Sequence, residues 1–254
     1  MTARIDVTRS HNGAVAHVAI DNQKKLNTLN TPLLEEAIGA LRVLAKDDAL
    51  RVVVITGAGE KAFIGGADIN EMAGLNAASA RAFISKVHGI CRAIRDLPMP
   101  AIARIDGYCL GAGLEVAASC DMRAASTRSV FGMPEVKVGI PSVVEAALLP
   151  RLIGWGRTAE LLMTAENIDA KTAGEWGFIE RVTAPDKLDE AVDGWIHSIL
   201  DNGPKAVRLQ KALMRRWERL ALDEAVAAGI DAFAQSMDSA EPAELLGKFV
   251  KRRK

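Results

Sequence analysis

Residues 106–115 read Asp-Gly-Tyr-Cys-Leu-Gly-Ala-Gly-Leu-Glu, a run of small residues that leads into an alanine-rich segment. The segment predicts a helix over Leu114–Ser119 with Glu115 in its first turn. The start of a helix presents free N–H groups and the positive end of a dipole, which suit a negatively charged oxygen. The stretch therefore predicts an oxyanion-binding loop. The structural alternative is a glutamate that only stabilises the helix dipole.

A second glycine-containing stretch lies earlier in the chain. Residues 61–69 read Lys-Ala-Phe-Ile-Gly-Gly-Ala-Asp-Ile and follow a predicted strand over Arg51–Thr56. Consecutive glycines let a backbone approach a ligand and present its N–H groups without a side chain in the way. Short glycine motifs often occur by chance, so a flexible loop is the alternative interpretation.

A third stretch surrounds Glu135. It reads Phe-Gly-Met-Pro-Glu over residues 131–135, and Val-Gly-Ile-Pro follows at 138–141. Pro134 and Pro141 restrict the backbone on both sides of the glutamate. A glutamate in a turn is usually solvated. An apolar setting would raise the pKa of its carboxyl and allow proton exchange near neutral pH.

Strand-like and helix-like patterns alternate around these stretches. Strands are predicted over Ala14–Ile20, Arg51–Thr56 and Ala101–Ile105, and helices over a segment with Thr31 as N-cap and over Ala80–Leu97. This alternation predicts a layered α/β core, and we place it over residues 1–185. No sequence repeat or low-complexity linker interrupts it.

From residue 186 to residue 254 the pattern is almost entirely helical. Apolar residues recur at helical spacing on one face of the first of these helices: Leu188, Ala191, Val192, Trp195, Ile196, Ile199 and Leu200. The sequence Asn-Gly-Pro at 202–204 then ends this helix. We predict a second, helical region whose apolar faces pack against another surface.

Composition narrows the function classes. The 254 residues hold 32 Lys+Arg and 32 Asp+Glu, and this balance disfavours a broad nucleic-acid-binding surface. The three cysteines form no CxxC pair and the four histidines show no ligand spacing, which disfavours a disulfide framework and a metal site. No apolar run is long enough for a membrane span, and the first ten residues lack the features of a secretory signal. We expect a cytoplasmic enzyme.

In this order and spacing, the three stretches resemble the enoyl-CoA hydratase/isomerase (crotonase) family, and the resemblance runs from Asn27 to Lys254. It implies a crotonase-like ββα spiral core with a C-terminal helical trimerisation region, in a homotrimer or homohexamer. It also implies an acyl-CoA thioester substrate. No separate cofactor is implied, because coenzyme A is part of the substrate.

The resemblance also implies roles for single residues. The backbone N–H groups of Ala67 and Ala112 match the family's oxyanion hole for the thioester oxygen. Glu115 and Glu135 match the two acid/base glutamates of the hydratases, which implies syn addition of water to a 2-enoyl-CoA to give a 3-hydroxyacyl-CoA. Further residues match positions near substrate or coenzyme A: Lys24, Lys61, Gly65, Ala67, Asp68, Ile69, Gly111, Phe233 and Phe249.

One segment departs from the family pattern. After Glu135, residues 139–150 replace the usual glycine-rich stretch and are one residue shorter. Ser142-Val-Val-Glu145 is predicted to be a capping box that opens a helix beside the acyl pocket. Ala112 also stands where a glycine is common, but its N–H group remains available.

Three other functions compete with hydration. A double-bond isomerase, or another acyl-CoA reaction on the same scaffold, could use Glu135 alone. A pure binding protein is a different class, since some members of the family have RNA affinity, and the zero net charge and the pair of glutamates disfavour it. A Rossmann dehydrogenase is strongly disfavoured, because no GxGxxG opens a helix after a first βα turn.

Overall fold

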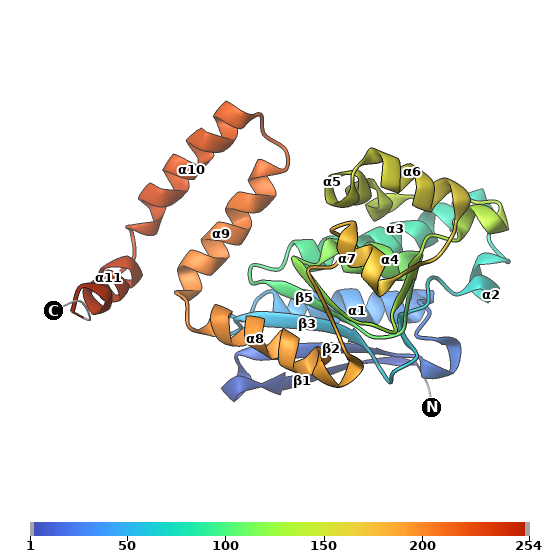
Figure 1. Ribbon diagram of the computed structural model, residues 1–254, viewed down its shortest axis with the longest axis horizontal. Helices are drawn as coiled ribbons and strands as arrows, with labels where there is room; N and C mark the ends of the chain where they lie inside the picture. The colour runs from blue at the N-terminus through green and yellow to red at the C-terminus, as the bar shows by residue number, and fades with distance from the viewer. Residues whose placement is uncertain (1–2, 252–254) are drawn as a thin grey trace.

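The computed structural model describes residues 3–251. A body of two β-sheets and their connecting helices carries the N-terminal end, and a chain of helices extends away from it to the C-terminal end (Figure 1). The larger sheet has the strand order β1 (Arg4–Ser10), β2 (Val15–Asp21), β3 (Val52–Gly57), β5 (Ala101–Ile105), β7 (Met122–Ser126) and β10 (Arg181–Thr183). The smaller sheet has the order β4 (Ala62–Ile64), β6 (Tyr108–Leu110), β8 (Val130–Gly132) and β9 (Ile168–Asp169).

The chain builds these sheets one spiral turn at a time. β3 and β4, β5 and β6, and β7 and β8 are three successive strand pairs, and each pair gives one strand to each sheet. Neighbouring strands from successive turns run parallel, as β3 with β5 and β4 with β6. This is the ββα spiral that the family resemblance implies. Because β4, β6 and β8 run parallel, the residues that follow them lie at the same end of the smaller sheet.

Seven helices belong to the body: α1 (Thr31–Leu44), α2 (Ile69–Met72), α3 (Ala77–Arg95), α4 (Ala112–Ser119), α5 (Leu149–Ile153), α6 (Trp155–Thr164) and α7 (Ala170–Glu175). All eight residues of α4 are buried, which explains why the sequence there is composed of small and apolar residues. Helix α4 therefore runs through the core, and any polar group on it is removed from water.

Two helix starts differ from the predictions. The N-cap of α1 is Asn30, whose side chain accepts a hydrogen bond from the Leu33 N–H at 3.1 Å, so the prediction of Thr31 was wrong by one residue. The Thr31 hydroxyl instead donates to Glu71 at 2.5 Å. Helix α3 begins at Ala77 rather than Ala80, because Asn76 and Ser79 form a capping box there. In both places an asparagine, a strong N-cap residue, sets the boundary.

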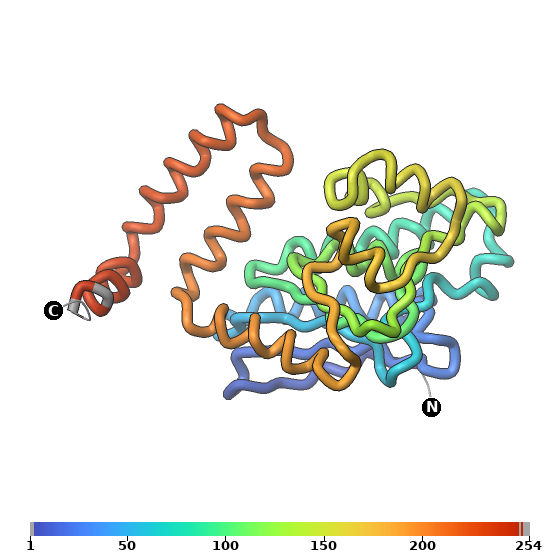
Figure 2. The backbone as a smooth tube through the Cα atoms, viewed as in Figure 1, coloured from blue at the N-terminus to red at the C-terminus, as the bar shows by residue number. Residues whose placement is uncertain are grey.

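The C-terminal helices are α8 (Leu188–Leu200), α9 (Pro204–Trp217), α10 (Leu222–Ser236) and α11 (Glu241–Lys251). Leu188, Val192 and Ile196 of α8 pack on Val52 and Val54 of the larger sheet. Helix α9 follows α8 and runs beside the body, and α10 and α11 lie farther out (Figure 2). The division of the chain at residue 186 remains a prediction, because α8 packs on the first region's sheet.

Polar contacts hold α9 against the body. Arg208 donates to the Leu50 carbonyl at 2.9 Å. Lys211 is buried, donates to the Met99 carbonyl at 2.9 Å and pairs with Asp121 at 2.8 Å. Between residues 3 and 251, no helix has the length and apolar character needed to cross a membrane.

Candidate active site

A cavity of about 670 Å³ lies where the loops after β4, β6 and β8 meet helix α3. Its size falls in the range of small-molecule sites. Ala67, Ala112, Glu115 and Glu135 all line it. The spiral therefore brings together four residues from three separate stretches of sequence.

The first loop follows β4. Gly66 has a φ of 113°, a conformation open to glycine but strained for other residues. The Leu29 N–H donates to the Gly66 carbonyl at 2.9 Å, and the Asp68 N–H donates to the Leu29 carbonyl at 2.8 Å. These bonds connect both chain neighbours of Ala67 to Leu29, which lies on one side of the loop. The N–H of Ala67 consequently points to the opposite side, as alternate residues of an extended chain do.

The second loop follows β6 and ends at Gly111, the residue before α4. The φ of Gly111 is 51°, which strains any residue other than glycine, and a Cβ atom there would lie 2.6 Å from Glu135 Oε1 and displace that carboxylate. Ala112 is the first residue of α4, and its N–H has no partner within the helix. The two loops thus present N–H groups of the kind that an oxyanion hole needs.

Glu135 begins the 3₁₀ helix η3 (Glu135–Val138), just after β8. Its Oε1 lies against Gly111, and its Oε2 accepts a hydrogen bond from the Ser142 hydroxyl at 2.8 Å. The carboxylate is therefore held beside the oxyanion loop, while its residue keeps intermediate exposure.

Glu115 lies in the first turn of α4 and is only 3% exposed. Burial raises the pKa of its carboxyl to about 8, and the nearby carboxylates Glu135 and Glu145 act in the same direction. The Ala146 N–H donates to Glu115 Oε1 at 3.2 Å and opposes this shift. A carboxyl with such a pKa exchanges its proton near neutral pH, as a general acid or base must.

The rest of the cavity wall is mostly apolar. It includes Met72, Leu75, Phe83, Ile84, Val87 and Val143. The prediction that the segment after Glu135 borders the pocket is confirmed by Val143, and by Ile140 and Pro141 before it. An apolar chain fits such a wall, because every buried methylene group contributes about 0.8 kcal/mol.

The predicted capping box over Ser142–Glu145 was wrong. The residue before the 3₁₀ helix η4 (Val144–Leu148) is Val143, which makes no side-chain cap hydrogen bond. Ser142 bonds Glu135 instead, and Glu145 turns inward, where its Oε1 lies 2.8 Å from His88 Nδ1. The capping pattern failed because both polar side chains have tertiary partners.

The residues matched to coenzyme A occupy different surroundings. Gly65, Gly111 and Ile69 line the cavity. Asp68 is buried, caps α2 and pairs with Lys25 at 2.6 Å, and this lysine is the main cause that lowers the pKa of its carboxyl. Lys24 and Lys61 are exposed and lie outside the cavity wall, so their contact with phosphates stays a prediction.

The two phenylalanines lie apart from this cavity or outside the description. Phe233 is 69% exposed on α10 and lines a separate groove with Trp217. The Phe249 side chain lies outside the described part of the chain. Their predicted roles near a ligand therefore remain predictions.

Sequence reasoning missed four contacts that shape the site. They involve Lys25 with Asp68, Ser142 with Glu135, Glu145 with His88, and Ala146 with Glu115. It also missed two cations that line the cavity, Arg81 and Lys137. Arg81 lies three residues before Ile84 on α3, and residues at this spacing share one side of a helix. That spacing is the one local signal that could have placed Arg81 beside the cavity.

Known proteins resemble this chain over nearly its whole length. The family model described as Enoyl-CoA hydratase/isomerase matches residues 10–254. A short-chain-enoyl-CoA hydratase from Clostridium acetobutylicum is 36% identical over 243 residues, which cover 95% of this chain and 93% of that protein. A crotonyl-CoA hydratase from Syntrophomonas wolfei is 36% identical over 241 residues, which cover 94% of this chain and 93% of that protein.

Solved structures agree with the sequence matches. An enoyl-CoA hydratase from Bacillus anthracis superposes with a TM-score of 0.93 at 33% identity, covering 98% of this chain and 96% of that one. An enoyl-CoA hydratase from Mycobacterium smegmatis superposes with a TM-score of 0.94 at 27% identity, covering 98% and 96%. Because both sequence and fold match, this chain belongs to the enoyl-CoA hydratase/isomerase family.

Proposed function

We propose that this protein is an enoyl-CoA hydratase, which adds water to the double bond of a 2-enoyl-CoA and forms a 3-hydroxyacyl-CoA. The observation that carries the proposal is one cavity lined by two carboxyl groups and by two loops with backbone N–H donors. Two relatives that are each 36% identical to this chain are named as hydratases, and these names support the proposal.

The cavity is lined by the groups that each step of hydration needs. The N–H groups of Ala67 and Ala112 bind the thioester oxygen and stabilise the negative charge that forms on it, each contributing about 3 kcal/mol. Glu115 takes a proton from water as the oxygen attacks the β-carbon. Glu135 gives a proton to the α-carbon. Both carboxyl groups line one cavity, which supports syn addition, in which the H and the OH of water add to the same face of the double bond.

The substrate is an acyl thioester whose coenzyme A part serves as a binding handle, and the reaction needs no other cofactor. The mostly apolar wall supports a hydrocarbon acyl group. We place the protein in the cytoplasm. Its three buried cysteines are free thiols, which suits a reducing compartment.

The purified protein is expected to hydrate 2-enoyl-CoA substrates, and the loss of absorbance of the conjugated enoyl-thioester band measures this. Substrates of increasing acyl length and branching would define the preferred chain. A 3-enoyl-CoA serves as the matched control, because an isomerase would create the conjugated band instead of removing it. No loss of the band with any member of the series would overturn the proposed function.

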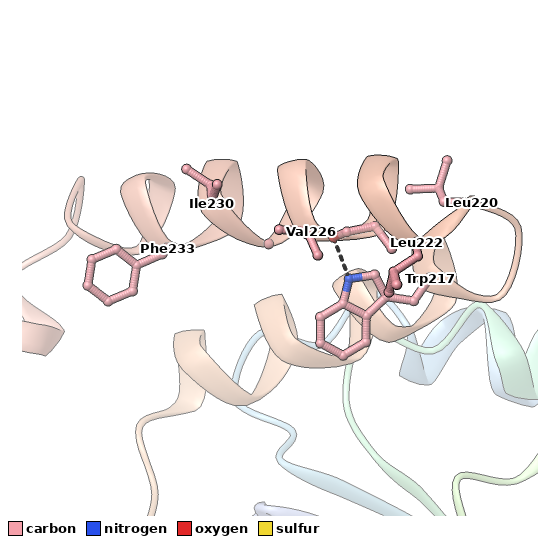
Figure 3. A pocket seen from close by; sticks show the side chains of 8 residues that line it. Trp217, Leu220, Leu222, Val226, Ile230 and Phe233 are labelled. Carbon is pink, nitrogen blue, oxygen red and sulfur yellow. Dashed lines mark hydrogen bonds between the residues drawn. The ribbon is translucent and has the colours of Figure 1, made fainter.

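Assembly into a homotrimer or homohexamer is part of the same proposal. Leu222, Val226, Ile230, Phe233 and Met237 form one exposed apolar stripe along α10. Trp217 of α9 contributes to the groove beside this stripe, and its indole N–H donates to the Ala225 carbonyl at 2.9 Å (Figure 3). An apolar stripe of this length is typical of a protein–protein contact.

Light scattering at micromolar concentration is expected to give the mass of a trimer or a hexamer. Ile230→Asp places a charge in the stripe and is expected to shift the protein towards smaller species, since an unpaired charge is costly in an apolar contact. Gln235→Asp, on the opposite side of α10, is the control and should leave the mass unchanged. A monomeric wild type would contradict the assembly.

A further inference from the structure

One hydrogen bond at the candidate active site comes from the segment that departs from the family pattern. The Ser142 hydroxyl donates to Glu135 Oε2 at 2.8 Å. Ser142 is half-buried and is not part of the cavity wall, whereas its neighbours Pro141 and Val143 line the cavity. The serine hydroxyl therefore acts on the reaction only through the Glu135 carboxyl.

A turn of the backbone brings this serine back to the glutamate. Gly139 ends η3 in a left-handed conformation with a φ of 80°, and the Ile140 N–H donates to the Glu135 carbonyl at 3.2 Å. The chain thus reverses its direction just after η3. A hydroxyl seven residues beyond Glu135 consequently comes within reach of its side chain.

The far end of the same segment is fixed to the body of the protein. Glu145 Oε1 lies 2.8 Å from His88 Nδ1 on α3. Val144, just before it, has a φ of 38°, which a β-branched residue almost never adopts. Such strain persists only where the surrounding structure enforces it. Residues 142–146 are therefore held in one conformation, and the serine is held with them.

This segment contacts one oxygen of each glutamate in the cavity. The Ala146 N–H donates to Glu115 Oε1 at 3.2 Å. The Ser142 hydroxyl holds Glu135 by Oε2, which leaves Oε1 without a hydrogen-bond partner among residues 3–251. That free oxygen adjoins Gly111, the last residue of the loop before α4. Oε1 is therefore the oxygen of Glu135 that lies on the side of the oxyanion loops.

Proton transfer to the α-carbon changes the charge of Glu135. In the proposed hydration the O–H bond at Oε1 breaks, a C–H bond forms at the α-carbon, and the electron pair stays on the carboxylate. A hydroxyl donates a stronger hydrogen bond to an ionised carboxylate than to a neutral carboxyl. The bond from Ser142 consequently strengthens as the proton leaves, and such an interaction raises kcat rather than tightening substrate binding. Glu135 regains its proton from water in the open cavity.

We propose that Ser142 is a positioning residue, which holds Glu135 by Oε2 and makes Oε1 the oxygen that gives the proton to the α-carbon. The proposal rests on the proposed hydratase function. It gives a role in that function to a side chain of residues 139–150, the segment in which this chain departs from the family pattern.

Ser142→Ala removes the hydroxyl and little else. The kcat for hydration of a 2-enoyl-CoA should fall by about 10-fold or more, the factor that matches loss of a hydrogen bond to a charged group, while KM changes little. Ser142→Thr keeps the hydroxyl and should retain most of the wild-type kcat. Exchange of solvent deuterium into the α-carbon of a saturated acyl-CoA should fall together with kcat in Ser142→Ala, because it depends on the same oxygen of Glu135.

A second comparison repeats Ser142→Ala in a chain that already carries Glu135→Gln. Glutamine does not ionise, so the hydroxyl has no developing charge to stabilise, and the added change should have little further effect on kcat. Ser198→Ala is the matched control. The Ser198 hydroxyl donates within α8, to the Gly194 carbonyl at 2.9 Å, and lies outside the cavity wall. This variant should match the wild type in kcat and in KM.

The outcomes separate positioning from simpler roles. An unchanged kcat in Ser142→Ala would overturn the proposal. An equal fall in kcat with and without Glu135→Gln would show that Ser142 only supports the loop, and a rise in KM alone would assign it to substrate binding. Either result would overturn the proposal as well. A wild type that hydrates no enoyl-CoA would remove the proposed function itself, a result distinct from each of these.

Discussion

Glu135→Gln and Glu115→Gln are each expected to lower the rate of enoyl-CoA hydration by about 10²–10⁴-fold, the usual contribution of general acid–base catalysis. Glutamine keeps the size of each side chain and much of its hydrogen bonding. It can still accept a bond from Ser142 at position 135 and from the Ala146 N–H at position 115. What is lost is the ionisable group, so a fall in rate reports on proton transfer rather than on packing.

The double variant extends this test. If the two carboxyl groups act as a unit on one water molecule, Glu115→Gln/Glu135→Gln should be little slower than either single variant. Solvent-proton exchange at the α-carbon of a saturated acyl-CoA should depend mainly on Glu135. Glu175→Gln is the control, because Glu175 is exposed and pairs with Lys171 at 3.8 Å, and neither residue lines the cavity.

The same variants separate a hydratase from an isomerase. An isomerase that uses Glu135 alone would lose the conversion of 3-enoyl-CoA to 2-enoyl-CoA in Glu135→Gln and keep it nearly intact in Glu115→Gln. Hydration at a near-wild-type rate by Glu115→Gln would contradict the two-glutamate mechanism and favour the isomerase.

Glu115→Gln is also expected to stabilise the fold, and to do so increasingly as the pH rises. The carboxyl has a pKa of about 8 in the folded chain against 4.5 for an ordinary glutamate, because burial disfavours its charged form. The folded state therefore holds this proton more tightly than the unfolded state does. The stability gained from the neutral carboxyl is complete below pH 4.5 and is lost progressively as the pH rises through about 8.

The full loss amounts to about 4–5 kcal/mol at most. Glutamine never ionises, so the variant escapes the loss. Between about pH 6 and about pH 9, the free energy of unfolding of Glu115→Gln should rise relative to the wild type by about 2–3 kcal/mol. Urea unfolding at the two pH values measures the difference.

Glu175→Gln again provides the control, since an exposed glutamate should show no such divergence. Parallel pH profiles for Glu115→Gln and the wild type would mean that the pKa of Glu115 is not raised. That outcome would leave the loops that carry Ala67 and Ala112 unaffected.

Much of the fold follows from local sequence patterns. The predicted strand over Ala101–Ile105 matches β5 residue for residue, and the other two predicted strands differ from β2 and β3 by one residue at each end. These segments are short apolar runs that a buried parallel sheet requires, so their pattern depends little on distant residues. The resemblance to the crotonase family, rather than any local pattern, predicted that the glycine loops and the two glutamates would share one site, and they line one cavity.

The sequence by itself determined the strands, the alanine-rich central helix and the glycine-containing loops, because glycine freedom and apolar periodicity act locally. Only the tertiary structure decided the partners of the polar side chains. His88 and Glu145 lie 57 residues apart, and Lys25 and Asp68 lie 43 apart, with no periodic relation to reveal them. Ser142 and Glu145 fit a capping box locally, yet each has a partner elsewhere in the fold. A polar side chain takes the hydrogen bond that burial leaves within its reach, and the packing of distant segments sets that choice.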